Sequence, residues 1–299
     1  MTVDSVNKGY ADYVYDSEGR LEETYSLNLY EYDYGSSING NSTYSSGTTY
    51  TYESTQGYKL LSSTSFYSAT NTSGSYTSSY SSTTESEYGY SSTPTSVYDY
   101  DQKRDVTQYD NDADGIIDYT NYSLYSITGN NSSSSVYVSV DAQSGIIYYS
   151  SDYEYSYVRN NKGGYTSTNS GSWANDWDND GIINGNSEYS SEYVYDSSNN
   201  LVSSSYESVY KNDYDEDRKA DYVSITKESR TNTSGKRLQL TWEDDSYGPA
   251  TLSIGIDKDT NGDYTYDSTR GFTIGFGAPP ASWTTMGGHV ATINDTLIV

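Results

Sequence analysis

Four aspartates surround one glycine in the segment DNDADGIID, which spans residues 110–118. Carboxylates crowded along one short segment repel one another, so the segment requires either full solvation or a bound cation. The chain supplies few positive charges of its own, because 16 Lys and Arg face 42 Asp and Glu, for a formal net charge of −26. Acidic turns of this kind constrain the fold more than any other feature of the sequence.

The same pattern recurs along the chain. DWDNDGIIN begins at Asp176, DYDEDRKAD at Asp213 and a partial copy, DKDTNGDYT, at Asp257. A degenerate relative, DSVNKGYAD, lies between Asp4 and Asp12. The copies are unevenly spaced, which indicates an irregular array with insertions and not a solenoid of fixed period.

Paired strand patterns follow the acidic segments. YTNYSLYSI, a turn TGNN and the return SSSSVYVSVD follow the first copy, and YVSITKESR, NTSG and KRLQLTWEDD follow the third. Alternating apolar residues around Gly/Asn turns predict β-hairpins. Aromatic residues reach 15%, and 39 of them are tyrosines, which favour half-buried pleated surfaces. We therefore predict an all-β fold, an elongated antiparallel hairpin meander or repeat array with calcium-binding Asp-rich turns.

Composition divides the chain into four segments. Residues 1–34 form an N-terminal hairpin unit, and residues 97–245 carry the acidic hairpin repeats. Residues 35–96 are rich in Tyr, Ser and Thr, and evenly spaced tyrosines favour further strands over a low-complexity linker. Residues 246–299 carry one degenerate acidic turn and an apolar tail that suits an assembly strand or an export signal.

Several functional classes are disfavoured. The chain has no cysteine and one histidine, which excludes disulfides and thiolate metal sites. The strong negative charge disfavours nucleic acid, and no apolar run approaches the ~18 residues of a membrane span, so we expect neither nucleic-acid binding nor membrane insertion. No carboxyl pair with an identifiable acid–base partner and no GxSxG motif is present, so we do not expect an enzyme.

Calcium takes six to eight oxygen ligands, using alternate side chains and a backbone carbonyl after a glycine turn. Numbered from the first Asp, positions 1, 3, 5, 7 and 9 of each acidic turn offer such oxygens. The predicted ligands are Asp110, Asp112, Asp114, the Ile116 carbonyl and Asp118; Asp176, Asp178, Asp180, the Ile182 carbonyl and Asn184; Asp213, Asp215, Asp217 and Asp221; and Asp257, Asp259, Asn261 and Asp263.

The alternative is that these segments are hairpin turns that bind nothing. It has most weight for the third copy, where Arg218 replaces glycine, and for the fourth. Position 12, the bidentate Glu of an EF-hand, is occupied by Asn121, Ser187 or Ser224. A neighbouring loop must then supply oxygens, with Asp99, Asp101 and Asp105 as candidates for the first copy. Fewer fixed ligands place the expected affinity near the 10⁻⁴–10⁻³ M of extracellular calcium modules.

Two motifs resemble known repeats. YDSEGRL at residues 15–21 and YDSSNNL at residues 195–201 resemble the Tyr-Asp turns of YD/Rhs repeats, with Asn199 and Asn200 in place of Gly-Arg. The DxDxDGxxD segments resemble the calcium turns of thrombospondin type 3 and dockerin-like repeats. The resemblance covers roughly residues 4–34 and 97–267. It implies a secreted bacterial surface protein of β-rich tandem repeats and names no activity.

The sequence thus predicts an extracellular, calcium-stabilised structural protein. It would be a subunit of a fibre, filament or biofilm matrix that assembles with copies of itself through sheet edges or terminal strands. The alternative is a calcium-dependent adhesin or carbohydrate-binding protein that uses exposed tyrosines and calcium to hold surface glycans.

Overall fold

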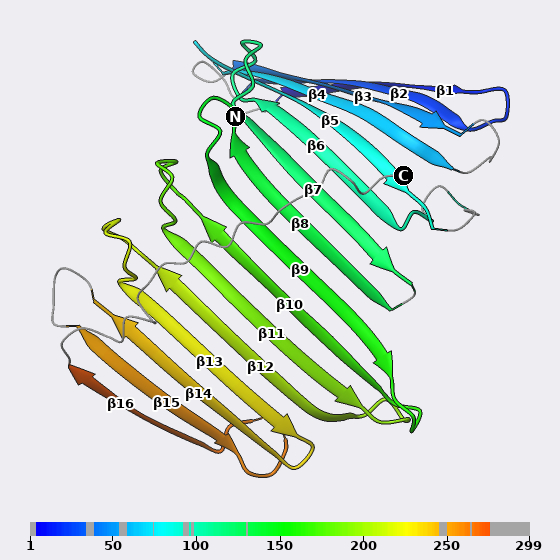
Figure 1. Ribbon diagram of the computed structural model, residues 1–299. Coiled ribbons are helices and arrows are strands. Elements are labelled where there is room, and N and C mark those ends of the chain that lie inside the picture. The colour runs from blue at the N-terminus through cyan, green and yellow to red at the C-terminus, as the bar shows by residue number, and fades with distance from the viewer. Residues whose placement is uncertain are drawn as a thin grey trace. The chain divides into compact units, whose positions relative to one another are not determined.

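The computed structural model describes residues 4–33, 39–53, 59–73, 75–91, 96, 99–129, 131–244, 250–263 and 265–275. These residues form sixteen β-strands and no helix (Figure 1). The strands are β1 (Asp4–Tyr15), β2 (Leu21–Asp33), β3 (Asn39–Tyr52), β4 (Leu60–Ser73), β5 (Tyr76–Gly89), β6 (Gln102–Asp110), β7 (Tyr119–Thr128), β8 (Ser132–Asp141), β9 (Ile147–Arg159), β10 (Tyr165–Asn175), β11 (Gly185–Tyr195), β12 (Leu201–Asn212), β13 (Tyr222–Thr231), β14 (Ser234–Glu243), β15 (Thr251–Asp259) and β16 (Ser268–Gly275).

The strands pair in chain order from β1 to β16, with no crossover. The pairs whose registers are resolved, β1 to β6 and β9 to β16, are all antiparallel. The predicted all-β antiparallel meander is therefore confirmed. β3, β4 and β5 occupy the Tyr/Ser/Thr-rich segment, where strands were favoured over a linker.

The chain folds as two compact units. One comprises the described residues up to Tyr125 together with Ser139–Gly145, and the other comprises Ser126–Val138 and the described residues from Ile146 onward. These boundaries differ from the four segments read from composition. The apolar tail predicted from composition lies outside the described residues beyond residue 275. Within the described part of the chain, no helix is long and apolar enough to cross a membrane.

Apolar packing is concentrated in the second unit. Val223 on β13 faces Trp242 on β14, and both are almost fully buried. Ala220 and Ala250 complete this cluster, with Ile225 and Leu252 packed against it. The alternation of β14 explains the arrangement, because every second side chain points to the same face.

Hydroxyl pairs and rings supply much of the remaining contact between strands. Hydroxyl oxygens meet across neighbouring strands at Ser26–Ser46 (2.8 Å), Thr84–Thr107 (2.9 Å), Ser126–Ser134 (2.8 Å) and Ser156–Thr168 (2.6 Å). Rings touch in a row across five strands of the first unit, in the order Tyr44, Tyr67, Tyr80, Tyr109 and Tyr119, with centroids 4.4–6.5 Å apart. Such cross-strand pairs stabilise a sheet that has few aliphatic residues.

The two Tyr-Asp turns share one hydrogen-bond pattern. Asp16 Oδ1 accepts from the N–H groups of Glu18 and Arg20, each at 2.9 Å. Asp196 Oδ1 accepts from residues at the same spacing, Ser198 at 2.8 Å and Asn200 at 2.9 Å. Gly19 and Asn199 both have positive φ, 77° and 65°. Asparagine tolerates this conformation better than most residues, which explains its place in the second turn.

Candidate metal centres

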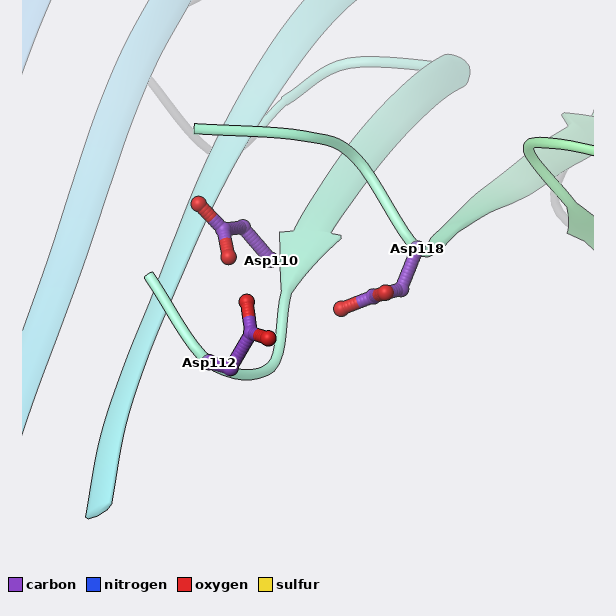
Figure 2. Close-up of side chains that lie close together, drawn as sticks. All are labelled: Asp110, Asp112 and Asp118. Atoms are coloured by element: carbon purple, nitrogen blue, oxygen red, sulfur yellow. The ribbon is translucent and has the colours of Figure 1, made fainter. Parts of the chain in front are cut away.

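The first metal-competent cluster lies in acidic turn 1, residues 110–118, between β6 and β7. Asp110, Asp112 and Asp118 each offer a carboxylate oxygen, and these oxygens lie within 4.8 Å of one another. Figure 2 shows the three side chains around a common space. Asp110 is only 5% exposed. The carboxylates that the sequence places at positions 1, 3 and 9 are thus brought together.

Backbone hydrogen bonds explain why this turn folds as it does. Asp110 accepts from the N–H groups of Asp114 (3.1 Å) and Gly115 (2.8 Å), and Asp118 accepts from Asn111 (2.6 Å). Positive φ at Ala113 (56°) and Gly115 (90°) lets the chain curl around Asp110. The position-5 carboxylate, Asp114, instead accepts from the N–H of Ile116 at 2.8 Å.

Acidic turn 2, residues 176–184, repeats this geometry between β10 and β11. Asp176 accepts from the N–H groups of Asp180 (3.2 Å) and Gly181 (2.7 Å). Asn184 at position 9 accepts from the N–H of Trp177 at 2.5 Å. The clustered carboxylates here belong to Asp176, Asp178 and Asp180, because position 9 carries an amide.

Acidic turn 3, residues 213–221, adopts the same turn without glycine at position 6. Arg218 has φ of 68° and donates its backbone N–H to Asp213 at 2.7 Å. Asp221 accepts from the N–H of Tyr214 at 2.6 Å, and Asp213, Asp215 and Asp221 form the cluster. The ammonium of Lys219 lies 2.6 Å from Asp217 and neutralises the position-5 carboxylate.

The carboxylates at position 1 are the acidic groups that each turn removes most completely from water. Asp110, Asp176 and Asp213 are 5%, 2% and 0% exposed. Burial raises the pKa of Asp176, Asp213 and Asp221 because it disfavours their charged forms. One oxygen of Asp213, Oδ1, is buried without a hydrogen-bond partner. A buried anionic oxygen without a donor is costly unless a cation meets it.

In the fourth turn the hydrogen bonds begin at Asp259, two residues after the first position that the sequence predicted. Asp259 accepts from the N–H groups of Asn261 (3.1 Å) and Gly262 (2.7 Å), and Asp267 accepts from Thr260 (2.6 Å). Asp263 accepts from Thr265 at 2.8 Å, as position 5 does in the other turns. Position 1 is therefore Asp259 and position 9 is Asp267, so acidic turn 4 spans residues 259–267.

Asp257, the predicted first ligand of that turn, forms an ion pair with an arginine. It lies within β15, where the guanidinium of Arg237 on β14 reaches its Oδ2 at 2.6 Å. Asp259 also has a cation of the chain's own nearby, since Arg230 Nη1 is 3.6 Å away. The guanidinium of Arg230 beside the position-1 carboxylate makes acidic turn 4 a poorer metal centre than the other three, which hold clustered carboxylates.

The neighbouring acids proposed for turn 1 have other contacts. Asp101 accepts from the N–H and hydroxyl of Ser91 at 2.5 Å, and Asp105 pairs with Lys103 at 2.9 Å. Asp99 accepts from the N–H of Ser96 at 2.8 Å. The carbonyls of Ile116 and Ile182 remain predicted ligands at position 7.

Sequence analysis missed two acids. Asp267 lies eight residues after Asp259, the spacing that separates Asp110 from Asp118, and this spacing was the signal for it. The pKa of Glu216, at position 4 of turn 3, is raised, chiefly by the negative charge of Asp178 in turn 2. No motif marked it.

No protein-family model, curated protein or solved structure matches the chain. Three carboxylates that converge in a partly buried turn, with backbone N–H groups orienting them, can hold a hard cation that prefers oxygen ligands.

Proposed function

We propose that the chain is an extracellular structural protein whose acidic turns bind Ca²⁺ and thereby stabilise a tyrosine-rich β-meander. The bound ions neutralise turns that otherwise repel one another. The protein would assemble with copies of itself into a fibre or matrix.

The carboxylate of Asp213 carries the calcium proposal. It is fully buried, one of its oxygens has no hydrogen-bond partner, and two further carboxylates lie within 4.8 Å. A divalent cation at this point would offset both the repulsion and the lost hydration. The recurrence of the same hydrogen bonds in turns 1 and 2 extends the argument to those turns.

Calcium fits these turns better than magnesium. The acidic turns offer acidic and amide side chains, and calcium accepts irregular sets of six to eight oxygens. Magnesium demands near-octahedral geometry and retains several waters. A weak calcium site would be filled at extracellular calcium concentrations, which supports the extracellular location.

Terminal strands support the assembly proposal. β1 and β16 stand at the two ends of the strand order, and each pairs with one described neighbour. β1 exposes Tyr10, Tyr13 and Tyr15, whereas Phe272 is exposed on β16. Unpaired strand edges with apolar side chains recruit further chains. Head-to-tail contact between such edges generates an open filament.

Electron microscopy of the purified full chain tests the assembly. We expect filaments or sheets in 10 mM CaCl₂ and dispersed particles in EGTA. A variant with Pro in place of Tyr13 on β1 should remain dispersed, because the Tyr13 N–H bonds the Asp12 side chain and not β2, and proline removes this donor from the free edge. Particles that stay monomeric in calcium at high concentration would contradict the assembly.

A second candidate function, glycan binding, is favoured by a hollow in the second unit. This hollow of about 290 Å³ is lined by hydroxyl-bearing residues and one acid: Thr128, Ser132, Ser133, Ser134, Glu154, Tyr155, Ser156, Thr168 and Ser170. Hydroxyls, a carboxylate and an aromatic ring are the groups that hold sugars. A glycan array in calcium distinguishes the two functions, since a building block should bind no glycan selectively.

A further inference from the structure

An apolar row crosses the last five strands and ends at the open edge of β16. The strand registers place five apolar side chains opposite one another across β12 to β16, in the order Val209, Ile225, Leu240, Ile254 and Phe272. Opposite residues in an antiparallel sheet share a face and pack against their neighbours. Phe272 is 56% exposed, and β16 pairs with β15 alone among the described strands. The row therefore ends on a large apolar side chain with one flank open.

The open edge of β1 presents a second apolar pair. Tyr10 stands opposite Leu27 on β2, and both side chains are exposed. The Tyr10 ring also lies 6.3 Å from the ring of Tyr25, measured between centroids. Among the described strands, β1 pairs with β2 alone. Each end of the strand order thus carries an exposed aromatic side chain beside an unpaired backbone edge, a combination that recruits another chain.

A charged residue stands two positions from each of these rings. On β1 the order is Tyr10 and then Asp12, whereas on β16 it is Arg270 and then Phe272. Residues two apart share one face of a strand. If β1 and β16 of two copies pair antiparallel with the rings opposite each other, Asp12 comes opposite Arg270. A parallel arrangement cannot match both pairs, so the two edges are complementary in one direction only.

Asp12 occupies the open edge in the single chain. Its Oδ1 accepts from the backbone N–H of Tyr13 at 2.9 Å, and its Oδ2 accepts from the hydroxyl of Tyr10 at 3.2 Å. An acidic side chain at a strand edge discourages pairing with any chain that offers it no cation. Arg270 on β16 is exposed and offers one. Asp12 therefore favours β16 over other strand edges as the partner of β1.

The strands at the two ends also differ in the sign of their charge. The strand residues of β1 and β2 include six acids and one lysine, a net charge of −5, whereas those of β13 to β16 include six bases and four acids, a net charge of +2. Copies of a chain with a net charge of −26 otherwise repel one another. Opposite charges at the two ends favour contact between unlike ends and oppose contact between like ends.

We propose that β1 of one copy pairs antiparallel with β16 of the next copy, with Tyr10 opposite Phe272 and Asp12 opposite Arg270. This inference rests on the proposed assembly and specifies its direction and its register. The apolar row that ends at Phe272 then continues into Tyr10 and Leu27 of the next copy. Each contact leaves one β1 and one β16 free, so the addition repeats head to tail.

Charge exchange in the full chain tests the direction of the contact. Asp12→Lys and Arg270→Glu each place like charges opposite each other, so each variant alone should need an at least about tenfold higher concentration to assemble in calcium, measured by sedimentation velocity. An equal mixture of the two variants should assemble as the unchanged chain does, because every contact between unlike variants again joins opposite charges. A variant that merely failed to fold would not be rescued by mixing.

Two substitutions away from both edges serve as matched controls for the charge exchange. Glu192→Lys on β11 and Arg159→Glu on β9 make equivalent charge changes at exposed strand positions. Each control variant should assemble at the same concentration as the unchanged chain.

Disulfide trapping tests the register, because the chain has no cysteine of its own. Chains with Tyr10→Cys, mixed with chains that carry Phe272→Cys, should form a covalent dimer in oxidising buffer, seen by non-reducing gel electrophoresis, since opposite residues reach disulfide distance. Thr273→Cys in place of Phe272→Cys is the control. It should give no covalent dimer, because a shift of one residue turns the side chain to the other face of the sheet.

The outcomes separate this contact from assembly in general. If the charge variants assemble alone as their controls do, if their mixture stays dispersed, or if Thr273→Cys is trapped as readily as Phe272→Cys, the proposed contact is refuted while assembly stands. If the unchanged chain does not assemble in calcium, the proposed assembly itself fails.

Discussion

Arg218 donates its backbone N–H to the Asp213 carboxylate at 2.7 Å while its φ is 68°. Gly115 and Gly181 make the same bond to Asp110 and Asp176, at 2.8 and 2.7 Å. The turn is therefore kept although a side chain occupies the left-handed conformation. The hydrogen bond to a buried carboxylate offsets part of the strain.

This strain predicts the effect of Arg218→Gly. The change removes the cost of holding a non-glycine residue in the left-handed conformation, which is about 1–2 kcal/mol. Part of this gain is lost because glycine is more flexible than arginine in the unfolded chain. We expect a net gain of up to about 1 kcal/mol in the free energy of unfolding, measured by urea denaturation in EGTA. Gly181→Ala is the converse change and should destabilise turn 2. A loss of stability in Arg218→Gly would mean that its side chain supplies an unrecognised contact.

Asp213→Asn should change the melting temperature in opposite directions without and with calcium. The amide oxygen can still accept from Arg218, but the buried negative charge is gone. In EGTA the melting temperature should rise, because burial and neighbouring carboxylates disfavour that charge. In calcium the variant should fall below the unchanged protein, since one bound ion at a hundredfold excess over its dissociation constant contributes about 2.7 kcal/mol. Destabilisation in both buffers would argue against a metal at this turn.

The free energy of unfolding should change with pH in opposite directions in the calcium-free and the calcium-bound protein. Burial raises the pKa of Asp176, Asp213 and Asp221 in the folded chain. Without metal, the folded state therefore binds more protons than the unfolded state above about pH 4, so stability falls as pH rises through the raised pKa values. Calcium binds the ionised carboxylates, so its stabilisation grows over the same range. Thermal melts from pH 4 to 7 check this, and parallel curves with and without calcium would contradict it.

Arg237→Ala distinguishes the structural role of Asp257 from a ligand role. Removal of the guanidinium leaves a carboxylate that is 3% exposed without its 2.6 Å partner. Because Arg237 is itself 34% exposed, the loss should be smaller than for a fully buried ion pair, about 1–3 kcal/mol. We expect this loss in urea denaturation both in EGTA and in calcium, with no change in calcium titration. If Arg237→Ala weakened calcium binding, Asp257 would be a calcium ligand as the sequence predicts.

The order of the hairpins could be predicted because local signals agree. Alternating residues such as Leu238, Leu240 and Trp242 define a strand, and in other hairpins a turn residue with positive φ, Gly19 or Asn199, separates the two strands. In acidic turns 1–3 the same spacing returns the same hydrogen bonds, even where Arg218 replaces glycine. These features depend on residues close together in the chain.

The remaining features depend on contacts between strands. Acidic or amide residues stand at every second position from Asp257 to Asp263, so either Asp257 or Asp259 could be the first residue of the turn. The ion pair of Asp257 with Arg237 on the neighbouring strand favours Asp259. The hydrogen bond from the N–H of Asp213 to the carbonyl of Asn184 likewise depends on how two turns lie side by side. No pattern within one turn contains that information.

Differential scanning calorimetry of the full chain tests the central claim that bound calcium stabilises this fold. The measurement compares EGTA with 10 mM CaCl₂, and a variant with Asp112, Asp178 and Asp215 all changed to Asn serves as the control. We predict that calcium raises the melting temperature by at least about 5 °C in the unchanged chain, because 10 mM exceeds the expected dissociation constants ten- to hundredfold and each filled turn then contributes about 1.4–2.7 kcal/mol. The triple variant should lose most of this shift. An unchanged melting curve in calcium, or an equal shift in the triple variant, would contradict the account.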